Sequence, residues 1–564
     1  MSIKIKKGFV NVNNGQVHYR MAGSGPPIIL LHDSPRSSVL HIPLLEYFSD
    51  TFTVIAIDTP GYGNSSALSA NFRPEIPDFA DALAETIVSF GVERCPVYGF
   101  HTSSKILLEF AANHPNRVSI AIMDGLSLPA GDTDHDFIKH YMRPFKVTET
   151  GSYLAEEWTR VRDFQRWFPW FQKNKTTRMP LDQKTIMDTH QYSMDLFMAG
   201  SNFSDAYSAA MRYKPLPVIS SLKAKCIFMA REDDVLYSFL DMLPNPLPAK
   251  CAIEKLSANK ENWRLRLREI FNSHADFDGA GTFVPPNPFT ETTDQTSIAQ
   301  SYVDSEAGQV LVRKAGEGNS NTIIFLHDLP GSCRSDEILI KALGRGRTCF
   351  GIDLPGCNES DPLNDKSSIG YIRSLADILS KLNLGSIDIV AEGLSCSLAL
   401  LFTFHNNNKV RRLVLDGMNT ETEQEIIEMK SHYLPILEPE INGSHLHKCW
   451  HMLRDQEIQW PWYNGSSAAI RAITPDLDAW KLHVRLVDTL KQYSNAKDAI
   501  LASLEINIFD LLPKTSNEVL IFDRVNDIRY AGAKEACNLL VKSTKKERHP
   551  DPLSRARQIL EFLD

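Results

Sequence analysis

Several signatures that would assign this chain of 564 residues to a familiar class are missing. Its nine cysteines are scattered singly, without C-x-x-C pairs or the spacing of a zinc site, which argues against a disulfide framework and a structural metal. No apolar run approaches the roughly 18 residues of a membrane helix, and the first residues lack the apolar core of a signal peptide. We therefore expect a cytoplasmic protein that makes no membrane contact.

Positive charge and phosphate-binding motifs are also scarce. The formal net charge is −9, so the chain has no general attraction for nucleic acid. Neither a P-loop nor a dinucleotide-binding fingerprint occurs. Hydrophobic residues at 43% and charged residues at 23% are ordinary for a globular protein. These features predict a protein without cofactor or nucleic-acid partner, whose ligand is a small molecule.

The chain contains the same pattern twice. The run IILLHDSP at 28–35 returns as IIFLHDLP at 323–330, and 26 residues separate its histidine from a D-x-P-G motif in both copies. Downstream pairs, from 117–118 with 409–410 to 169–170 with 461–462, keep a constant offset of 292 residues. A constant offset without gaps predicts a tandem duplication of a unit of about 270 residues.

Composition suggests where the copies meet. Residues 278–298 are rich in Gly, Pro, Ser and Thr, as linkers are. We predict a first domain over 1–277, a linker over 278–298 and a second domain over 299–564. We expect the two domains to contact each other within the chain, as the subunits of a homodimer do.

Short apolar runs alternate with helical segments in both halves. Many of the runs are apolar on both faces, which is typical of a parallel sheet covered by helices on each side. The expected strands are 27–31, 53–57, 95–98, 119–123 and 225–229 in the first half, and 322–326, 348–352, 387–391, 412–415 and 518–522 in the second. Helices are expected at 77–91 and 104–114, among others. Both halves therefore have the pattern of an α/β fold.

Residues 32–35 read HDSP, residues 58–65 read DTPGYGNS, and residues 231–234 read REDD. With these motifs, each half resembles the α/β-hydrolase superfamily: they resemble, in that order, its H-G-x-P loop, its D-x-x-G-x-G-x-S motif and the turn that holds its acid. The resemblance covers nearly the whole chain. It implies two tandem α/β-hydrolase-like domains, each a mostly parallel sheet covered by helices, with helical lid insertions over about 126–215 and about 418–510.

The nucleophile position departs from the family pattern. The family carries G-x-S-x-G on a tight strand-to-helix turn. Residues 99–103 read G-F-H-T-S, a G-x-H-T type of turn with His101 in place of the serine, and the second half has Gly393 there. Although Asp527 and His549 stand near the usual places of an acid and a base, a half without a nucleophile is predicted to be catalytically inactive.

His101 is the candidate catalytic base, because an imidazole with a pKa near 6.5 can accept a proton at neutral pH. The resemblance assigns the orienting acid to Asp234, with Asp233 adjacent, and the oxyanion donors to the backbone amides of Thr102 and Ser34. Residues 256–263, where the family's own histidine is expected, contain none. The Ser-His-Asp triad is therefore not intact, and His101 either performs the chemistry or fills a decayed site.

The neighbours of this turn have further expected roles. Asp33 replaces a glycine of the family and either bonds locally or places negative charge near the oxyanion site. His32 is expected to be structural. Ser103 and Ser104 are expected to pack the helix against the strand rather than act as nucleophiles.

His140 and Trp170 complete the candidate substrate-binding residues. They recur as His432 and Trp462 in the half predicted to be inactive, so an architectural role stays open. Two functions follow. One is a cofactor-independent enzyme that uses His101 on a small organic molecule, by hydrolysis or by a base-initiated lyase, cyclase or isomerase step. The alternative is a non-catalytic pseudo-hydrolase that binds a ligand or a protein partner.

Overall fold

The chain divides by its internal contacts into two units. A computed structural model describes residues 4–13, 15–68, 73–129, 134–276, 283, 287, 289, 297–306, 308–318 and 320–564. The first unit comprises Met1–Lys146 and Glu156–Glu291, and the second comprises Val147–Ala155 and Thr292–Asp564. Most of the predicted linker lies outside the described residues, and the boundaries at 277 and 299 stay predictions.

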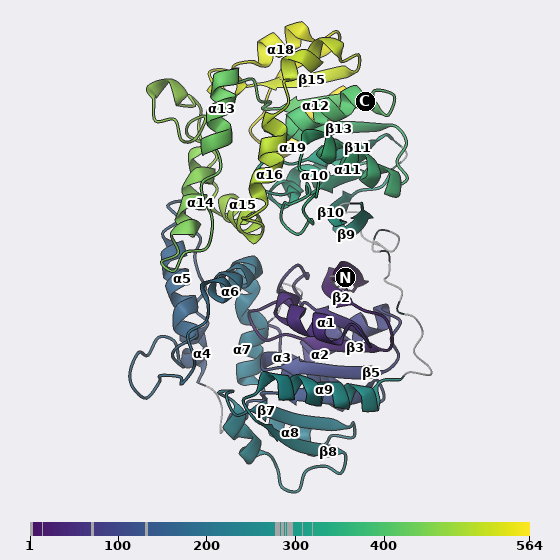
Figure 1. Cartoon of the computed structure of the whole chain (residues 1–564), viewed down its shortest axis with the longest axis vertical. Helices are drawn as coiled ribbons and strands as arrows, with labels where there is room; N and C mark the ends of the chain where they lie inside the picture. The colour runs from purple at the N-terminus through teal and green to yellow at the C-terminus, as the bar shows by residue number, and fades with distance from the viewer. Residues whose placement is uncertain are drawn as a thin grey trace. The chain divides into compact units, whose positions relative to one another are not determined.

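The first unit is built on a sheet of eight strands in the order β1-β2-β4-β3-β5-β6-β7-β8 (Figure 1). β2 pairs antiparallel with β1 and β4, and the remaining pairs are parallel. The strands are β1 (Lys6–Val12), β2 (Gly15–Ala22), β3 (Pro27–Leu31), β4 (Thr53–Ile57), β5 (Cys95–Phe100), β6 (Val118–Asp124), β7 (Cys226–Arg231) and β8 (Cys251–Leu256). The helices are α1 (Ile42–Phe48), α2 (Ile76–Ser89), α3 (Thr102–Asn113), α4 (His135–Tyr141), α5 (Tyr153–Phe164), α6 (Ile186–Ala199), α7 (Asp205–Arg212), α8 (Pro215–Ser220) and α9 (Lys260–His274).

The second unit repeats this topology, with strands in the order β9-β10-β12-β11-β13-β14-β15-β16. Its strands are β9 (Ile298–Ser305), β10 (Gly308–Ala315), β11 (Thr322–Leu326), β12 (Cys349–Ile352), β13 (Ile387–Glu392), β14 (Val410–Asp416), β15 (Glu518–Asp523) and β16 (Ser543–Glu547). Its helices are α10 (Glu337–Leu343), α11 (Ser368–Lys381), α12 (Ser395–His405), α13 (Glu423–His432), α14 (Ser444–Asp455), α15 (Ala479–Lys491), α16 (Ala496–Leu504), α17 (Ile508–Leu511), α18 (Ala533–Leu539) and α19 (Pro552–Leu563).

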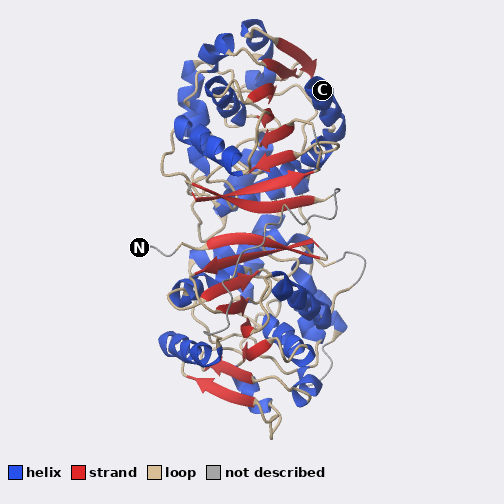
Figure 2. Ribbon diagram, turned by 90° about the vertical axis from the view of Figure 1, so that its right-hand side faces the viewer, coloured by secondary structure: helices blue, strands red, loops and turns tan. Residues whose placement is uncertain are grey.

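Each sheet is covered on both faces, and Figure 2 shows strands with helices on either side. Successive side chains of a strand point to opposite faces. In β3, Ile29 joins the core that includes Phe79 of α2, whereas Ile28 joins the core that includes Leu45 of α1 and Phe271 of α9. The continuous apolar runs of the sequence are therefore explained by burial on two sides.

The predicted fold is confirmed: both units have a mostly parallel sheet with surrounding helices. The ten expected strands appear as β3 to β7 and β11 to β15. Helices α4 to α7 follow β6, and α13 to α16 follow β14, in the segments predicted as lids, whereas α8 and α17 begin at or near the predicted ends of these segments. Their action as lids stays a prediction. No helix in the described part of the chain is long and apolar enough to cross a membrane.

Candidate functional site

The turn after β5 places His101 at the carboxyl edge of the first sheet. Its backbone has φ 49° and ψ −109°, and α3 begins at the next residue, Thr102. A positive φ at a residue with a side chain costs about 1–3 kcal/mol and is held only by surrounding structure. Gly393 occupies the same turn after β13, with φ 56°. Both units therefore keep a strand-to-helix turn with positive φ, which is strained only in the first unit, where the residue has a side chain.

The His101 ring is hydrogen-bonded to a carboxylate. Its Nε2 lies 2.9 Å from Oδ2 of Asp234, whose other oxygen accepts the backbone N–H of Leu236 at 2.8 Å. Asp234 accepts both bonds, so in the neutral imidazole Nε2 carries the proton and Nδ1 holds the lone pair. The side chain of His101 remains 26% exposed, whereas that of Asp234 is 6% exposed. The structure thus brings together the two residues that the sequence predicts, and Asp233 instead binds Arg231.

The position of the ring depends on its neighbours. Phe100 stacks on it with centroids 4.0 Å apart and planes at 24°. Gly125 lies directly beneath, because a Cβ there would be 2.5 Å from Cδ2 of His101. Since β5 and β6 are parallel neighbours and pair Phe100 with Asp124, their carboxyl ends bring His101 and Gly125 together.

The charges around the His101–Asp234 pair, here called the dyad, favour an imidazolium beside a carboxylate. Burial lowers the pKa of His101, but the hydrogen bond and charge of Asp234, with a contribution from Asp33, outweigh it and raise the pKa above its usual value. Burial raises the pKa of Asp234, but His101 outweighs that effect and lowers it. His101 therefore releases its proton at a higher pH than a free histidine.

Trp263 occupies the segment where the family's histidine is expected. Its Nε1 donates to Asp124 at 2.9 Å, and the hydroxyl of Tyr98 donates to the same oxygen at 2.8 Å. Burial raises the pKa of Asp124 to about 6. This buried carboxyl is thus held by neutral donors beside the dyad.

The loop after β3 is held by His32. The backbone N–H of Thr59 donates to its Nε2 at 2.9 Å, so its Nδ1 donates to the carbonyl of Asp33 at 2.7 Å. The carboxylate that follows is less well satisfied, because Oδ1 of Asp33 is buried and has no hydrogen-bond partner among the described residues. Burial raises the pKa of Asp33. The geometry fits a structural role for His32 and leaves negative charge beside Ser34.

The two serines after the turn do not face the dyad. The Ser103 hydroxyl donates to the carbonyl of Leu31 at 2.9 Å, and that of Ser104 donates to the carbonyl of His101 at 2.5 Å. Both residues are fully buried. They pack α3 against the sheet, as expected.

His140 and Trp170 differ in exposure and in the contacts that they make. His140 is exposed and its ring lies 4.2 Å from that of Phe171, so it does not join the dyad. Trp170 is partly buried, and its Nε1 donates to the carbonyl of Tyr141 at 2.9 Å. The hydroxyl of Tyr141 lies 3.2 Å from that of Tyr207. Their roles in substrate binding stay predictions.

In the second unit the equivalent space is filled by a carboxylate. Oδ1 of Asp328, the counterpart of Asp33, accepts the amides of Leu329 at 2.8 Å and Leu394 at 3.1 Å, and its Oδ2 accepts from Arg529 at 2.7 Å. A Cβ on Gly393 would lie 1.7 Å from Oδ1 of Asp328. This turn cannot carry any side chain while Asp328 is in place.

Asp527 and His549, the expected acid and base of the second unit, bind different partners and not each other. Asp527 is buried and accepts two hydrogen bonds from Arg471, at 2.9 and 2.7 Å. His549 is exposed, and its Nδ1 accepts the amide of Asp551. Sequence reasoning missed Arg471 and Arg529, although their presence in only one copy of the repeat was a usable signal.

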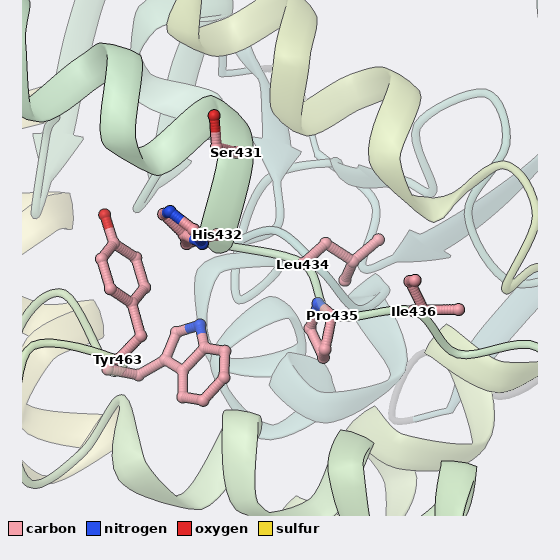
Figure 3. A pocket seen from close by; sticks show the side chains of 7 residues that line it. Ser431, His432, Leu434, Pro435, Ile436 and Tyr463 are labelled. Carbon is pink, nitrogen blue, oxygen red and sulfur yellow. The ribbon is translucent and has the colours of Figure 1, made fainter.

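A pocket of about 510 Å³ lies in the second unit beside the end of α13 (Figure 3). It is lined by Ser431, His432, Leu434, Pro435, Ile436, Trp462 and Tyr463. The rings of His432 and Tyr463 are 5.6 Å apart. The counterparts of His140 and Trp170 thus line a pocket here.

Within the described residues, no group of three His, Cys, Asp or Glu side chains is arranged to hold a metal ion.

The chain matches the sequence profile of one family, described as alpha/beta hydrolase fold. The match covers residues 26–204 and again 321–439, which together exceed half of the chain.

Individual relatives match over shorter stretches. The (E)-2-((N-methylformamido)methylene)succinate hydrolase of Acinetobacter baylyi is 31% identical over 115 residues, which are 20% of this chain and 43% of that protein. Bifunctional epoxide hydrolase 2 of Rattus norvegicus is 34% identical over 20% of this chain and 21% of its own length. An uncharacterized hydrolase of Saccharomyces cerevisiae is 23% identical over 37% of this chain and 78% of its own. The chain thus spans less than half of the first two relatives.

Solved structures are similar to part of the chain. A laboratory evolved variant of potato epoxide hydrolase matches with a TM-score of 0.38 and 19% identity, over 47% of this chain and 99% of that one. An esterase from Exiguobacterium antarcticum matches with a TM-score of 0.36 and 15% identity, over 46% of this chain and 98% of that one.

Proposed function

Because the chain belongs to the alpha/beta hydrolase family, we propose that its first unit is a cofactor-independent enzyme in which His101 acts as the general base on a small organic molecule. The observation that carries this proposal is the 2.9 Å hydrogen bond between Nε2 of His101 and Asp234, on a strained turn that leaves the ring partly exposed.

A single imidazole here does the work of two family residues. In a Ser-His-Asp triad the histidine lies between the acid and the nucleophile. Here the ring extends from the nucleophile position itself and reaches Asp234 directly. The histidine of the other loop is therefore unnecessary, and Trp263 can take that segment.

The proposed reaction begins with proton removal by Nδ1 of His101. The proton comes from a bound water, which then attacks an acyl carbon, or from a substrate carbon or hydroxyl that starts a lyase, cyclase or isomerase step. Asp234 stabilises the imidazolium that forms. The negative charge that develops on the substrate oxygen would be met by the amides of Thr102 and Ser34.

The second unit supports this oxyanion site. The amides at the corresponding positions, Leu394 and Leu329, both donate to one oxygen, Oδ1 of Asp328. Since these two amides donate to one oxygen in the second unit, we expect the amides of Thr102 and Ser34 to donate to one substrate oxygen in the first. We propose that the second unit itself is non-catalytic, since its oxygen site is filled and its turn lacks a side chain.

The test is a panel of p-nitrophenyl esters and thioesters, assayed with the full-length chain and its variants. His101→Ala should lower turnover by roughly 10²-fold or more, and Asp234→Asn should lower it with a shifted pH profile. Asp233→Asn is the matched control, because its carboxylate binds Arg231 rather than the ring. Turnover that is indifferent to His101→Ala would show that His101 only fills space.

A further inference from the structure

The two units differ in the cations that surround the same pair of acids. In the second unit, Arg529 donates to Asp328 and Arg471 binds Asp527 through two hydrogen bonds. A third guanidinium, that of Arg485, lies 3.9 Å from Asp328. The carboxylates at the edge of this sheet are therefore compensated within the chain.

The counterparts of these arginines in the first unit are uncharged. Leu236 corresponds to Arg529, because each amide donates to the acid two residues earlier, Asp234 or Asp527. Met179 corresponds to Arg471, since their amides donate at 2.9 Å to carbonyls 13 residues before each of them, those of Arg166 and Ile458.

Tyr192 corresponds to Arg485 by the same reasoning. Each lies three residues before an aspartate that accepts a serine hydroxyl: Asp195 from Ser37 at 2.7 Å, and Asp488 from Ser332 at 2.5 Å. The first unit thus keeps both acids of the site and lacks all three arginines.

The remaining cations do not satisfy Asp33. His101 is paired with Asp234. The Nε of Arg36 donates to Asp195 at 2.9 Å, so one guanidinium stands between two carboxylates, those of Asp195 and Asp33. Asp33 is partly exposed, and its Oδ1 has no partner among the described residues. Oδ1 of Asp33 is therefore a buried acceptor without a donor among the described residues, and such a group needs a physical explanation.

Aromatic side chains accompany Asp33 and its neighbour Arg36, whose guanidinium lies 5.1 Å from the centre of the Tyr192 ring. Burial raises the pKa of Tyr192 and of Tyr207, the latter to about 12, and in both the negative charge of Asp33 adds to the effect. Neutral phenols beside a carboxylate form a suitable environment for an organic cation, whose charge pairs with the acid while its apolar part packs on the rings.

We propose that the site around Asp33 and His101 in the first unit binds an organic molecule bearing a single positive charge, such as a primary ammonium group, with Asp33 as its counter-ion. As a substrate class, this assignment rests on the proposed function: the ammonium group would anchor on Asp33 while the reacting atom faces Nδ1 of His101. Esters that carry an ammonium group should then be turned over faster than uncharged esters of similar size.

The experiment is a calorimetric titration of the full-length chain with three probes of similar size: benzylamine, benzyl alcohol and benzoate. The wild type should bind benzylamine at least about tenfold more tightly than the other two, and Asp33→Asn should remove that preference. Leu236→Arg installs the guanidinium of the second unit and should abolish amine binding as well. Asp328→Asn, in the second unit, is the matched control and should leave amine binding unchanged. Thermal unfolding of each variant verifies that it is folded.

The outcomes separate this inference from the proposed function. Benzylamine that binds no more tightly than benzyl alcohol, or equally well to wild type and Asp33→Asn, would overturn the cation site. If Asp33→Asn does not fold, amine binding that persists in Leu236→Arg would overturn it instead. His101→Ala should retain amine binding and lose turnover. Amine binding with turnover that survives in His101→Ala would sink the catalytic proposal alone.

Discussion

The strand-to-helix turn after the central strand carries different residues in the two units. In the first it carries His101, which reaches Asp234 and remains partly exposed. In the second it carries Gly393, and Asp328 with Arg529 occupies the space that a side chain would need. The difference teaches that the two α/β-hydrolase units fill the same turn in two ways: with an imidazole that is hydrogen-bonded to a carboxylate, or with an internal ion pair beside a glycine.

The largest effect is expected from forcing a side chain into the second turn. Gly393→Ser would place Cβ within 1.7 Å of Asp328 and 2.5 Å of Arg529, at a positive φ that disfavours any side chain. Displacing this buried pair should lower the free energy of unfolding by about 3–5 kcal/mol, measured by denaturant titration. Gly385→Ser is the control, since nothing lies within 4 Å of its Cβ. Equal stability of both variants would show that the second site is open.

Removal of the arginine alone should have a somewhat smaller effect. Arg529→Leu gives the second unit the residue of the first and leaves Asp328 with only the more distant Arg485, a loss of about 3 kcal/mol. Burial raises the pKa of Asp328, but Arg529 and Arg485 outweigh it and lower the pKa to about 2.

The sign of the pH effect follows from that shift. A carboxylate with a lowered pKa in the folded state adds stability above its unfolded pKa of 3.8, and this stability is lost as the pH falls toward 2. The wild type should therefore lose about 2 kcal/mol between pH 5 and pH 2 from this group, and Arg529→Leu should lose less. Parallel stability curves for the two proteins would contradict the role of Arg529.

A smaller effect is expected from a substitution beneath the His101 ring in the first unit. Gly125→Ala would place a methyl group 2.5 Å from the His101 ring and should displace it, lowering turnover roughly tenfold with a loss of about 1–2 kcal/mol of stability. The matched variant Gly417→Ala meets Tyr530 only at 3.2 Å, so it should show the backbone strain without loss of turnover. Equal activity of both variants would indicate that the position of the ring is unimportant.

Local patterns predicted the interior of each sheet and missed its margins. The ten expected strands are apolar runs buried on both faces, such as β3. The edge strands β8 and β16 are largely exposed; β8 has a short apolar run that Glu254 and Lys255 interrupt, and β16 is polar throughout, so no continuous apolar run reveals them. The hairpin of β1 and β2 recurs in the second half as β9 and β10, and none of these four strands was predicted.

The site was predictable only where it follows the chain's motifs. His101 and Asp234 were found from the turn after β5 and from the acid turn after β7, and only the structure decided between Asp234 and Asp233. The bonds from Arg471 and Arg529 join residues 56 and 201 positions apart. Such pairing depends on tertiary packing, which no local pattern contains.

The most direct test of the central claim, that the first unit retains a reactive imidazole–carboxylate pair, is an NMR titration of His101 in the full-length chain, assigned with His101→Ala. The pKa of His101 should lie above 6.5 in the wild type and fall in Asp234→Asn, because the carboxylate that stabilises the imidazolium is lost. A pKa at or below 6.5 that does not change in Asp234→Asn would contradict the account.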